Sequence, residues 1–209
     1  MKSKQRSGVG QLVELVVIVA IALLLALGIQ AFLIKPYRIP SGSMEPTLGI
    51  GQRVLVNRIG NRFDDPKVGE ILVFHPPEPA LHHDGQGGDS NECGVQPPAG
   101  QPCPQADGRE DSQNFIKRVV AGPGDVITIR QGHVIRNGKA EPDSYTMPCR
   151  DSSGCDFPTA LRVPAGHWFM MGDNRGDSDD SRFWGPVPKQ WIIGGAFATY
   201  WPVTRIGLL

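Results

Sequence analysis

Two serines separated by one glycine, Ser41 and Ser43, are the residues of this sequence best suited to chemistry. They lie in the segment 40–47, Pro-Ser-Gly-Ser-Met-Glu-Pro-Thr, where the prolines restrict the backbone and the glycine permits close approach by another chain. Ser43 is therefore a candidate nucleophile. It follows Ile34, the end of the only long apolar run, by nine residues. At ~3.3 Å per extended residue it lies within about 30 Å of that run, which indicates a substrate in a membrane.

The long apolar run predicts a transmembrane helix over 11–34, preceded by a tail at 1–10. At ~1.5 Å per helical residue, such a run crosses a hydrocarbon core of about 30 Å. A cleaved signal peptide is the alternative, because residues 26–28, Ala-Leu-Gly, could serve as a cleavage site. The apolar core of a signal peptide is usually about 7–15 residues long. This run continues past that site, which favours an uncleaved anchor in contact with membrane lipid.

Charge bears on partners and on orientation. The chain has 21 basic and 21 acidic residues, a net charge of zero and no basic block, so nothing indicates nucleic acid as a partner. Lys2, Lys4 and Arg6 favour a cytoplasmic N-terminus, although Lys35 and Arg38 weaken the asymmetry.

Cysteine spacing supplies a second argument on orientation. The four cysteines fall in two short-range pairs, Cys93 with Cys103 and Cys149 with Cys155. Such pairs suit two small disulfide loops, which persist only outside the reducing cytosol. Zinc bound by the first pair with His82 and His83 is the alternative, but the ligand spacing typical of zinc sites is absent. We therefore expect residues 35–209 to lie on the extracytoplasmic side of the cell membrane, with no metal.

The apolar pattern after residue 35 is typical of short strands. Segments rich in Val, Ile and aromatic residues, bounded by Gly or Pro, occur at 53–57, 70–74, 115–120, 125–129 and 196–201, and 132–138 ends in an Asn-Gly hairpin turn. No later segment sustains a helical period over three turns. The sequence therefore predicts a mostly β, antiparallel domain. The polar stretch 75–113 is expected to be a long mobile insertion.

Lys117 is a second candidate for chemistry. On a strand it would share one face with Phe115 and Val119. To be half neutral at about pH 7.5, its pKa would have to fall roughly three units from ~10.4, which burial can cause. A neutral lysine can take the proton of a serine. Taken alone, however, this strand favours a structural lysine that protects a sheet edge from aggregation.

The third segment is 172–182, Gly-Asp-Asn-Arg-Gly-Asp-Ser-Asp-Asp-Ser-Arg. By composition it could be an ordinary polar loop or an oxygen-rich calcium loop. It lacks the spacing and the closing glutamate of an EF-hand.

Together and in this order, three motifs closely resemble those of bacterial type I signal peptidases. They are Pro-Ser-Gly-Ser-Met-x-Pro-Thr, Ile-Lys-Arg-Val-Val-x-Gly-x-Pro-Gly-Asp and Gly-Asp-Asn-Arg-x-x-Ser-x-Asp-Ser-Arg. The resemblance implies a membrane-bound serine protease with a Ser/Lys dyad and no cofactor, which removes signal peptides from exported precursor proteins. It also implies two antiparallel β-sheet regions. A smaller β subdomain would be inserted between the second and third motifs, here at about 130–165.

The resemblance also implies a role for each residue that matches a motif. Ser43 matches the nucleophile and Lys117 the general base, while the Ser41 hydroxyl and the Ser43 N–H match an oxyanion hole. Ser178 matches a hydroxyl that orients the lysine, and Asp180 and Arg182 match a supporting ion pair. The implied substrate groove consists of apolar positions suited to the small side chains of an Ala-x-Ala site: Tyr37, Ile39, Pro40, Met44, Leu48, Phe115 and Ile116. The substrate would add as a strand beside 37–41 and 114–117.

One departure concerns the two carboxylates that flank Ser178. Family members often have an uncharged residue at one or both of these places, Asp177 and Asp179. A carboxylate near Lys117 would favour its charged form, so we expect both to point away from the dyad.

Three other functions compete with this one. A Ser-His-Asp arrangement could use one of five histidines, His75, His82, His83, His133 or His167, but none lies in a recognisable catalytic context. A catalytically inactive, membrane-anchored scaffold of the same fold would lack Ser43 or Lys117, and both are present. A cytosolic Ser/Lys autoprotease, similar to the repressor-cleavage family, disagrees with the anchor and the cysteine pairs.

Overall fold

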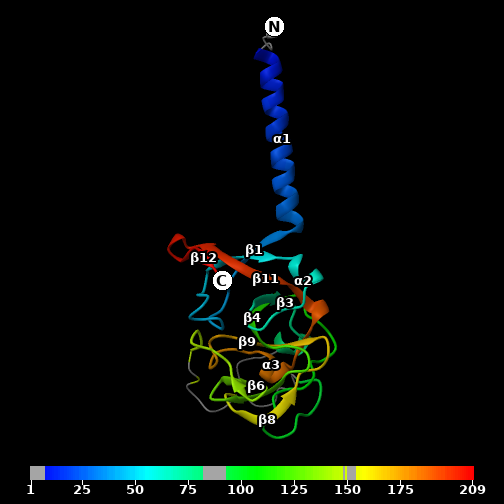
Figure 1. The fold of residues 1–209 in the computed structure, drawn as a ribbon, viewed down its shortest axis with the longest axis vertical. Helices are drawn as coiled ribbons and strands as arrows, with labels where there is room; N and C mark the ends of the chain where they lie inside the picture. The colour runs from blue at the N-terminus through cyan, green and yellow to red at the C-terminus, as the bar shows by residue number, and fades with distance from the viewer. Residues whose placement is uncertain (1–7, 82–92, 148, 150–153) are drawn as a thin grey trace.

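A long helix, α1 (Gly8–Phe32), projects from a β-rich body in this computed structural model, which describes residues 8–81, 93–147, 149 and 154–209 (Figure 1). Apolar side chains along α1 are exposed, and within the described ranges it is the one helix long and apolar enough to cross a membrane. The helix begins earlier and ends earlier than the predicted 11–34. Pro36 cannot continue a helix, and the chain enters a strand at Ile34.

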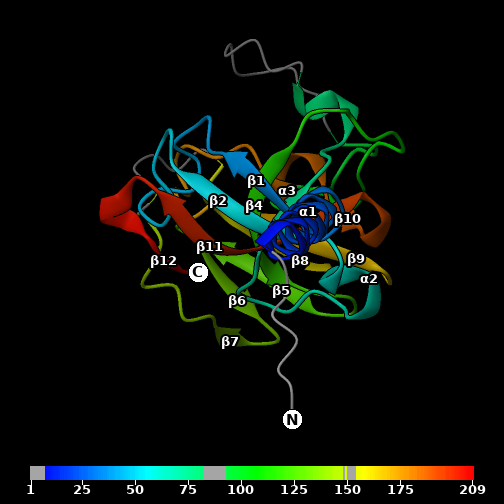
Figure 2. The same ribbon diagram turned by 90° about the horizontal axis from the view of Figure 1, so that it is seen from above.

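The larger sheet is antiparallel and carries the residues nearest to α1. Its order is β1 (Ile34–Arg38), β2 (Arg53–Asn57), β11 (Ile192–Trp201), β3 (Ile71–Phe74), β4 (Phe115–Ala121), β9 (His167–Met171) and β10 (Val187–Pro188), and β12 (Gly207–Leu208) pairs with β11. Viewed from above, β1, β2 and β11 run side by side near the base of α1 (Figure 2). Four of these strands, β1, β9, β10 and β12, were not predicted, and β11 begins four residues before its predicted start.

The smaller sheet lies at the end of the body farthest from α1 (Figure 1). Its order is β7 (Lys139–Ala140), β6 (His133–Arg136), β5 (Val126–Arg130) and β8 (Phe157–Arg162), again all antiparallel. The sheet begins at Val126 because a turn closed by the Asp125 N–H and the Gly122 carbonyl separates β4 from β5. The prediction of a mostly β, antiparallel fold is confirmed. The helical segments of the body are short: α2 (Gly60–Phe63), α3 (Ser181–Trp184), η1 (Glu78–Leu81), η2 (Lys189–Trp191) and η3 (Val203–Arg205).

Two hydrophobic clusters meet at β4. The Met44 cluster contains Ile39, Met44, Leu48, Val54, Val56, Ile71, Val73, Ile116 and Ala196. The Trp184 cluster contains Leu72, Phe74, Ala80, Val119, Trp168, Met170, Trp184, Val187 and Trp191, with Phe115 packed against it. Successive side chains of a strand point to opposite faces, so Phe115 and Ile116 join different clusters. Packing on both faces of the sheet thus holds the start of β4, the part of the strand that carries Lys117.

The insertion 75–113 is attached to the body where the structure describes it. A disulfide joins Cys93 and Cys103, with 5.5 Å between their Cα atoms. Cys103 is buried, and its N–H donates to the Arg182 carbonyl at 3.0 Å. Because Cys93 and Cys103 are joined in this disulfide, they are not available as zinc ligands. His82 and His83 lie outside the described residues.

Candidate active site

Ser43 lies in a loop that packing holds in place. Met44 and Leu48 are completely buried and anchor the loop in the Met44 cluster. The Ile39 N–H donates to the Gln52 carbonyl at 2.8 Å, which joins the start of the loop to its end. The Ser41 and Ser43 hydroxyl oxygens are 3.4 Å apart. Two neighbouring hydroxyl groups are therefore presented together from a backbone that packing and hydrogen bonds hold in place.

Ser43 and Lys117 line one cavity of about 400 Å³. The rest of its wall consists of Pro40, Ser41, Gly42, Ala80, Gln113, Asn114, Phe115, Ile116, Asp177 and Asp179. A larger hollow of about 790 Å³ lies between Gln105, His167 and Trp191, and neither Ser43 nor Lys117 borders it. The smaller cavity is the one that combines a hydroxyl with a possible base.

Lys117 is buried within the sheet, with 4% of its surface exposed. The edge-strand alternative is wrong, because β4 pairs with β3 on one side and with β9 on the other. Burial lowers the pKa of Lys117 from 10.5 to about 8, against the carboxylates of Asp180, Asp179 and Asp177, which favour the charged form. At a pKa of about 8, roughly a tenth of Lys117 is neutral at pH 7, and this neutral form can accept a proton.

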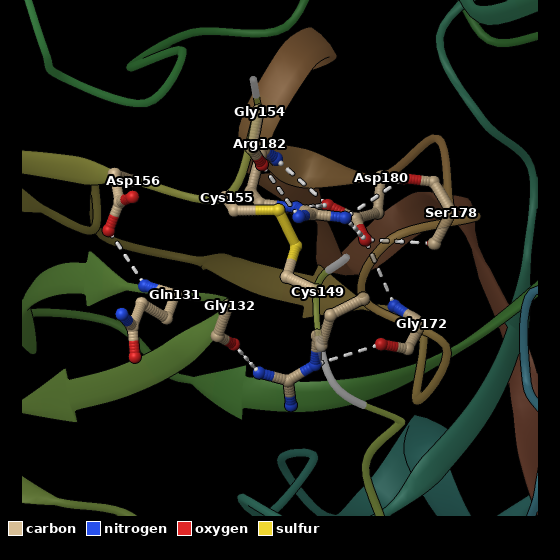
Figure 3. The surroundings of a disulfide bond; sticks show 11 residues. Gln131, Gly132, Cys149, Gly154, Cys155, Asp156, Gly172, Ser178, Asp180 and Arg182 are labelled. Carbon is tan, nitrogen blue, oxygen red and sulfur yellow. Dashed lines mark hydrogen bonds and ion pairs between the residues drawn. A yellow bond between two sulfur atoms is a disulfide. The ribbon is translucent and has the colours of Figure 1, made fainter. Parts of the chain in front are cut away.

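Asp180 is the completely buried carboxylate at the centre of the site (Figure 3). It accepts hydrogen bonds from Arg182 Nε at 2.7 Å and Nη2 at 3.0 Å, from Ser178 Oγ at 2.8 Å and from the Gly172 N–H at 3.0 Å. Burial alone would raise the pKa of Asp180, but the Arg182 guanidinium holds it below its ordinary value. Asp180 is thus ionised and fully compensated.

Ser178 has its proton committed to Asp180. Its oxygen consequently has lone pairs left to accept an N–H from a neighbouring amine. Gly172 makes the close approach of the site loop possible, because a Cβ at this position would fall 2.3 Å from Ser178 Oγ and 2.4 Å from the Ser43 carbonyl oxygen. Residue 172 must therefore lack a side chain for Ser178 and Ser43 to lie so close.

Two arginines, Arg175 and Arg182, donate to backbone carbonyls in loops next to the small sheet, and Figure 3 labels Arg182 with its acceptor Gly154. Arg182 Nη1 donates to the Gly154 carbonyl at 2.8 Å, next to the disulfide that joins Cys149 to Cys155. Arg175 is also buried; its Nε donates to the Gly172 carbonyl at 2.9 Å, and its Nη1 donates to the Gly132 carbonyl. The loop that carries Ser178 is held between the two sheets.

Sequence reasoning missed a second ion pair at the site, between the buried Asp173 and the partly buried Arg118. Arg118 Nε and Nη2 donate to the two carboxylate oxygens of Asp173 at 2.8 and 2.7 Å, and Thr47 Oγ1 donates to the same carboxylate. The Arg118 guanidinium also stacks 4.0 Å from the Tyr145 ring centre. Arg118 and Asp173 both stand in the motifs quoted above, which was the available signal. This pair joins the strand of Lys117 to the loops of Ser43 and Ser178.

The expectation for Asp177 and Asp179 is wrong. Both line the cavity of Ser43 and Lys117 rather than pointing away from it. A turn closed by the Asp177 N–H and the Asn174 carbonyl, at 3.1 Å, brings this part of the loop back over the cavity. Their carboxylates raise the pKa of Lys117 relative to what burial alone would give.

The implied groove residues divide into two groups. Pro40, Phe115 and Ile116 line the cavity. Ile39, Met44 and Leu48 are at most 2% exposed and belong to the Met44 cluster, against which the half-buried Tyr37 packs. The second group forms the floor beneath the loop of Ser43 and not its open wall.

The described histidines bond elsewhere. His75 Nδ1 lies 3.0 Å from the Gln113 carbonyl, His133 Nδ1 lies 2.6 Å from Asp143, and His167 Nδ1 lies 2.8 Å from the Ala165 carbonyl. As far as the described residues define it, the wall of the Ser43 cavity contains no histidine. A Ser-His-Asp arrangement is therefore not assembled here from these three residues.

The comparisons with known proteins agree with this geometry. The model of the family described as signal peptidase, peptidase S26, matches residues 12–201. The chain belongs to this family, and it is a peptidase. It is 37% identical to a probable signal peptidase I-1 of Synechocystis sp., with 94% of this chain and 86% of that protein covered. It is also 37% identical to a signal peptidase I of Leptolyngbya laminosa, with 95% and 84% covered.

Removal of the charge on Asp180 is expected to destabilise the peptidase strongly. In Asp180→Asn, Arg182 keeps its buried positive charge without a compensating carboxylate, which typically costs about 3–5 kcal/mol. The measurement is urea unfolding of the detergent-solubilised chain. The matched control is Asp65→Asn, which removes one partner of an exposed pair with Lys189 and should cost less than about 1 kcal/mol. Equal losses in the two variants would contradict the role given to Asp180.

Proposed function

We propose that this peptidase is a membrane-anchored serine endopeptidase that cleaves N-terminal signal peptides from exported precursor proteins after an Ala-x-Ala-like site. Ser43 is the nucleophile and Lys117 the general base. The observation that carries this proposal is a buried lysine of depressed pKa in the same cavity as a serine held by a rigid loop. Membership of the signal peptidase family agrees with it.

The reaction proceeds in two steps. Neutral Lys117 takes the proton of Ser43 Oγ, which attacks the scissile carbonyl carbon, and the Ser43 N–H and the Ser41 hydroxyl stabilise the oxyanion. The tetrahedral intermediate collapses to an acyl-enzyme when the leaving amine receives the proton from Lys117. Water then attacks the acyl-enzyme, with Lys117 again taking and returning a proton, and the signal peptide leaves with a free carboxylate.

Ser178 and Asp180 act on the base. The Ser178 oxygen accepts one N–H of Lys117 while its own proton is held by Asp180, so the lone pair of neutral Lys117 is directed at Ser43. A lysine base needs no partner to fix a tautomer, but it does need one to fix its direction. Arg182 neutralises Asp180 and so keeps that carboxylate from forming a direct ion pair with Lys117.

The substrate binds as an extended strand beside 37–41 and 114–117. Its small residues before the scissile bond lie over the Met44 cluster, whose members Ile39, Met44 and Leu48 are buried. A shallow groove over these packed side chains would exclude large residues and give the preference for an Ala-x-Ala site.

The peptidase crosses the membrane once through α1, with its N-terminus in the cytoplasm and residues 35–209 outside. Supporting observations are the exposed apolar surface of α1 and two disulfides in the body. Protease added to intact spheroplasts is expected to degrade the body and to leave a tag on residue 1 intact. The control is the same tag after lysis, which should become accessible. Protection of the body in intact spheroplasts would contradict this orientation.

Ser43→Ala is expected to abolish cleavage of a precursor with an Ala-x-Ala site, because it removes only the attacking oxygen. Ser41→Ala should lower the rate about 10²–10³-fold, the usual cost of one oxyanion donor. The matched control is Ser144→Ala at an exposed turn, which should leave the rate unchanged. Activity above a few per cent in Ser43→Ala would place the nucleophile elsewhere.

The pH dependence of kcat/KM is expected to report the neutral form of Lys117. Because its pKa is lowered to about 8, the rate should rise with pH to a midpoint near 8 and fall about tenfold per pH unit below it. Lys117→Arg should be inactive at every accessible pH, since a guanidinium does not give up its proton there. Lys117→Met should also be inactive yet folded.

The control for these variants is Lys139→Arg on exposed strand β7, which should keep both the rate and the pH profile. Substantial cleavage by Lys117→Arg would overturn the Ser/Lys mechanism even if Ser43 proved essential.

A further inference from the structure

The insertion between β3 and β4 supplies part of the catalytic cavity. Its two arms pair as they leave and re-enter the sheet: the Glu78 N–H donates to the Arg109 carbonyl at 2.9 Å, and the Asp111 N–H donates to the Pro76 carbonyl at 2.8 Å. This pairing places η1 near the start of β4. That strand begins at Phe115, two residues before Lys117. The start and end of the insertion are therefore ordered parts of the body next to the catalytic cavity.

Ala80, in η1, both joins the core and lines the cavity of Ser43. It is 4% exposed and belongs to the Trp184 cluster together with Phe74. It also lines the cavity of Ser43 and Lys117. Because its side chain ends at Cβ, a longer side chain here would extend either into the packed cluster or into the cavity.

The two clusters that meet at β4 give the cavity two different sides. Of the residues expected to lie under the signal peptide before the scissile bond, Ile39, Met44, Leu48 and Ile116 belong to the Met44 cluster, whereas Phe115 packs against the other cluster. Ala80 and the adjoining Phe115 belong to the Trp184 side. A peptide that passes over Ser43 with its signal-peptide residues on the first side must place its next residues toward the second.

We infer that Ala80 is a specificity-determining residue, which limits the size of the first residue after the scissile bond, the future N-terminal residue of the mature protein. Ala80 and the Phe115 ring form the wall that this side chain meets when the substrate is bound. This inference rests on the proposed function, since it requires that Ser43 be the nucleophile. The inference also assigns a function to the part of the insertion nearest the sheet. The sequence alone indicated no function for this insertion.

The test is a panel of synthetic precursor peptides that share one Ala-x-Ala site and differ only in the residue after it: Ala, Leu, Phe or Trp. In Ala80→Leu, kcat/KM for the Phe and Trp peptides should fall at least about tenfold relative to the Ala peptide, in line with the usual effect of small steric changes in a pocket. In Ala80→Gly, the Trp peptide should gain relative to the Ala peptide.

The matched control is Ala99→Leu, the same substitution at an exposed position of the same insertion; it should leave all ratios unchanged. A second panel varies the residue three positions before the scissile bond, and its ratios should be the same in wild type and both Ala80 variants. If Ala80→Leu fails to fold, Ala80→Gly alone decides.

Three outcomes would overturn the inference. Unchanged ratios in the folded Ala80 variants would remove Ala80 from specificity. An equal loss with every peptide would make Ala80 purely structural, and a change confined to the second panel would place it on the signal-peptide side. Failure of the wild-type peptidase to cleave any peptide would instead overturn the proposed function itself, and this inference with it.

Discussion

The buried carboxylate of Asp180 is the group on which the rest of the site depends. It takes hydrogen bonds from Arg182, Ser178 and the Gly172 backbone, and it lies in a region where an uncompensated charge would be very costly. Arg182 lies directly against Asp180. The Asp180 carboxylate still favours the charged form of Lys117, but burial outweighs this effect and leaves the pKa of Lys117 lowered. The same carboxylate also holds the Ser178 hydroxyl at 2.8 Å.

This arrangement makes the two sheets a single functional unit. Among the described residues, none of the smaller sheet lines the cavity, yet the Gly154 and Gly132 carbonyls, in loops next to this sheet, accept bonds from Arg182 and Arg175. The ion pair of Arg118 and Asp173 also fixes the loop that follows β9, because it joins this loop to the strand of Lys117. Groups from distant parts of the chain are therefore held at the site by paired charges and backbone acceptors rather than by apolar contact alone.

The sequence was sufficient where local pattern and motif spacing decide the structure. β2, β3, β4 and β5 alternate or are bounded by Gly and Pro, and they were found within a residue or two. β9, His-Trp-Phe-Met-Met, was missed because it is buried on both faces and shows no alternation. The placement of Asp177 and Asp179 depends on a turn, and the pairing of Arg118 with Asp173 spans 55 residues. Neither is encoded in local periodicity.

The junction of α1 with the body is short and hydrogen-bonded. Only Leu33 separates the helix from β1, and its carbonyl accepts the Arg58 N–H at 3.0 Å. The body therefore lacks a flexible tether at this point. If α1 spans a bilayer, as proposed above, this short junction would hold the loop of Ser43 at a nearly constant height above the lipid surface.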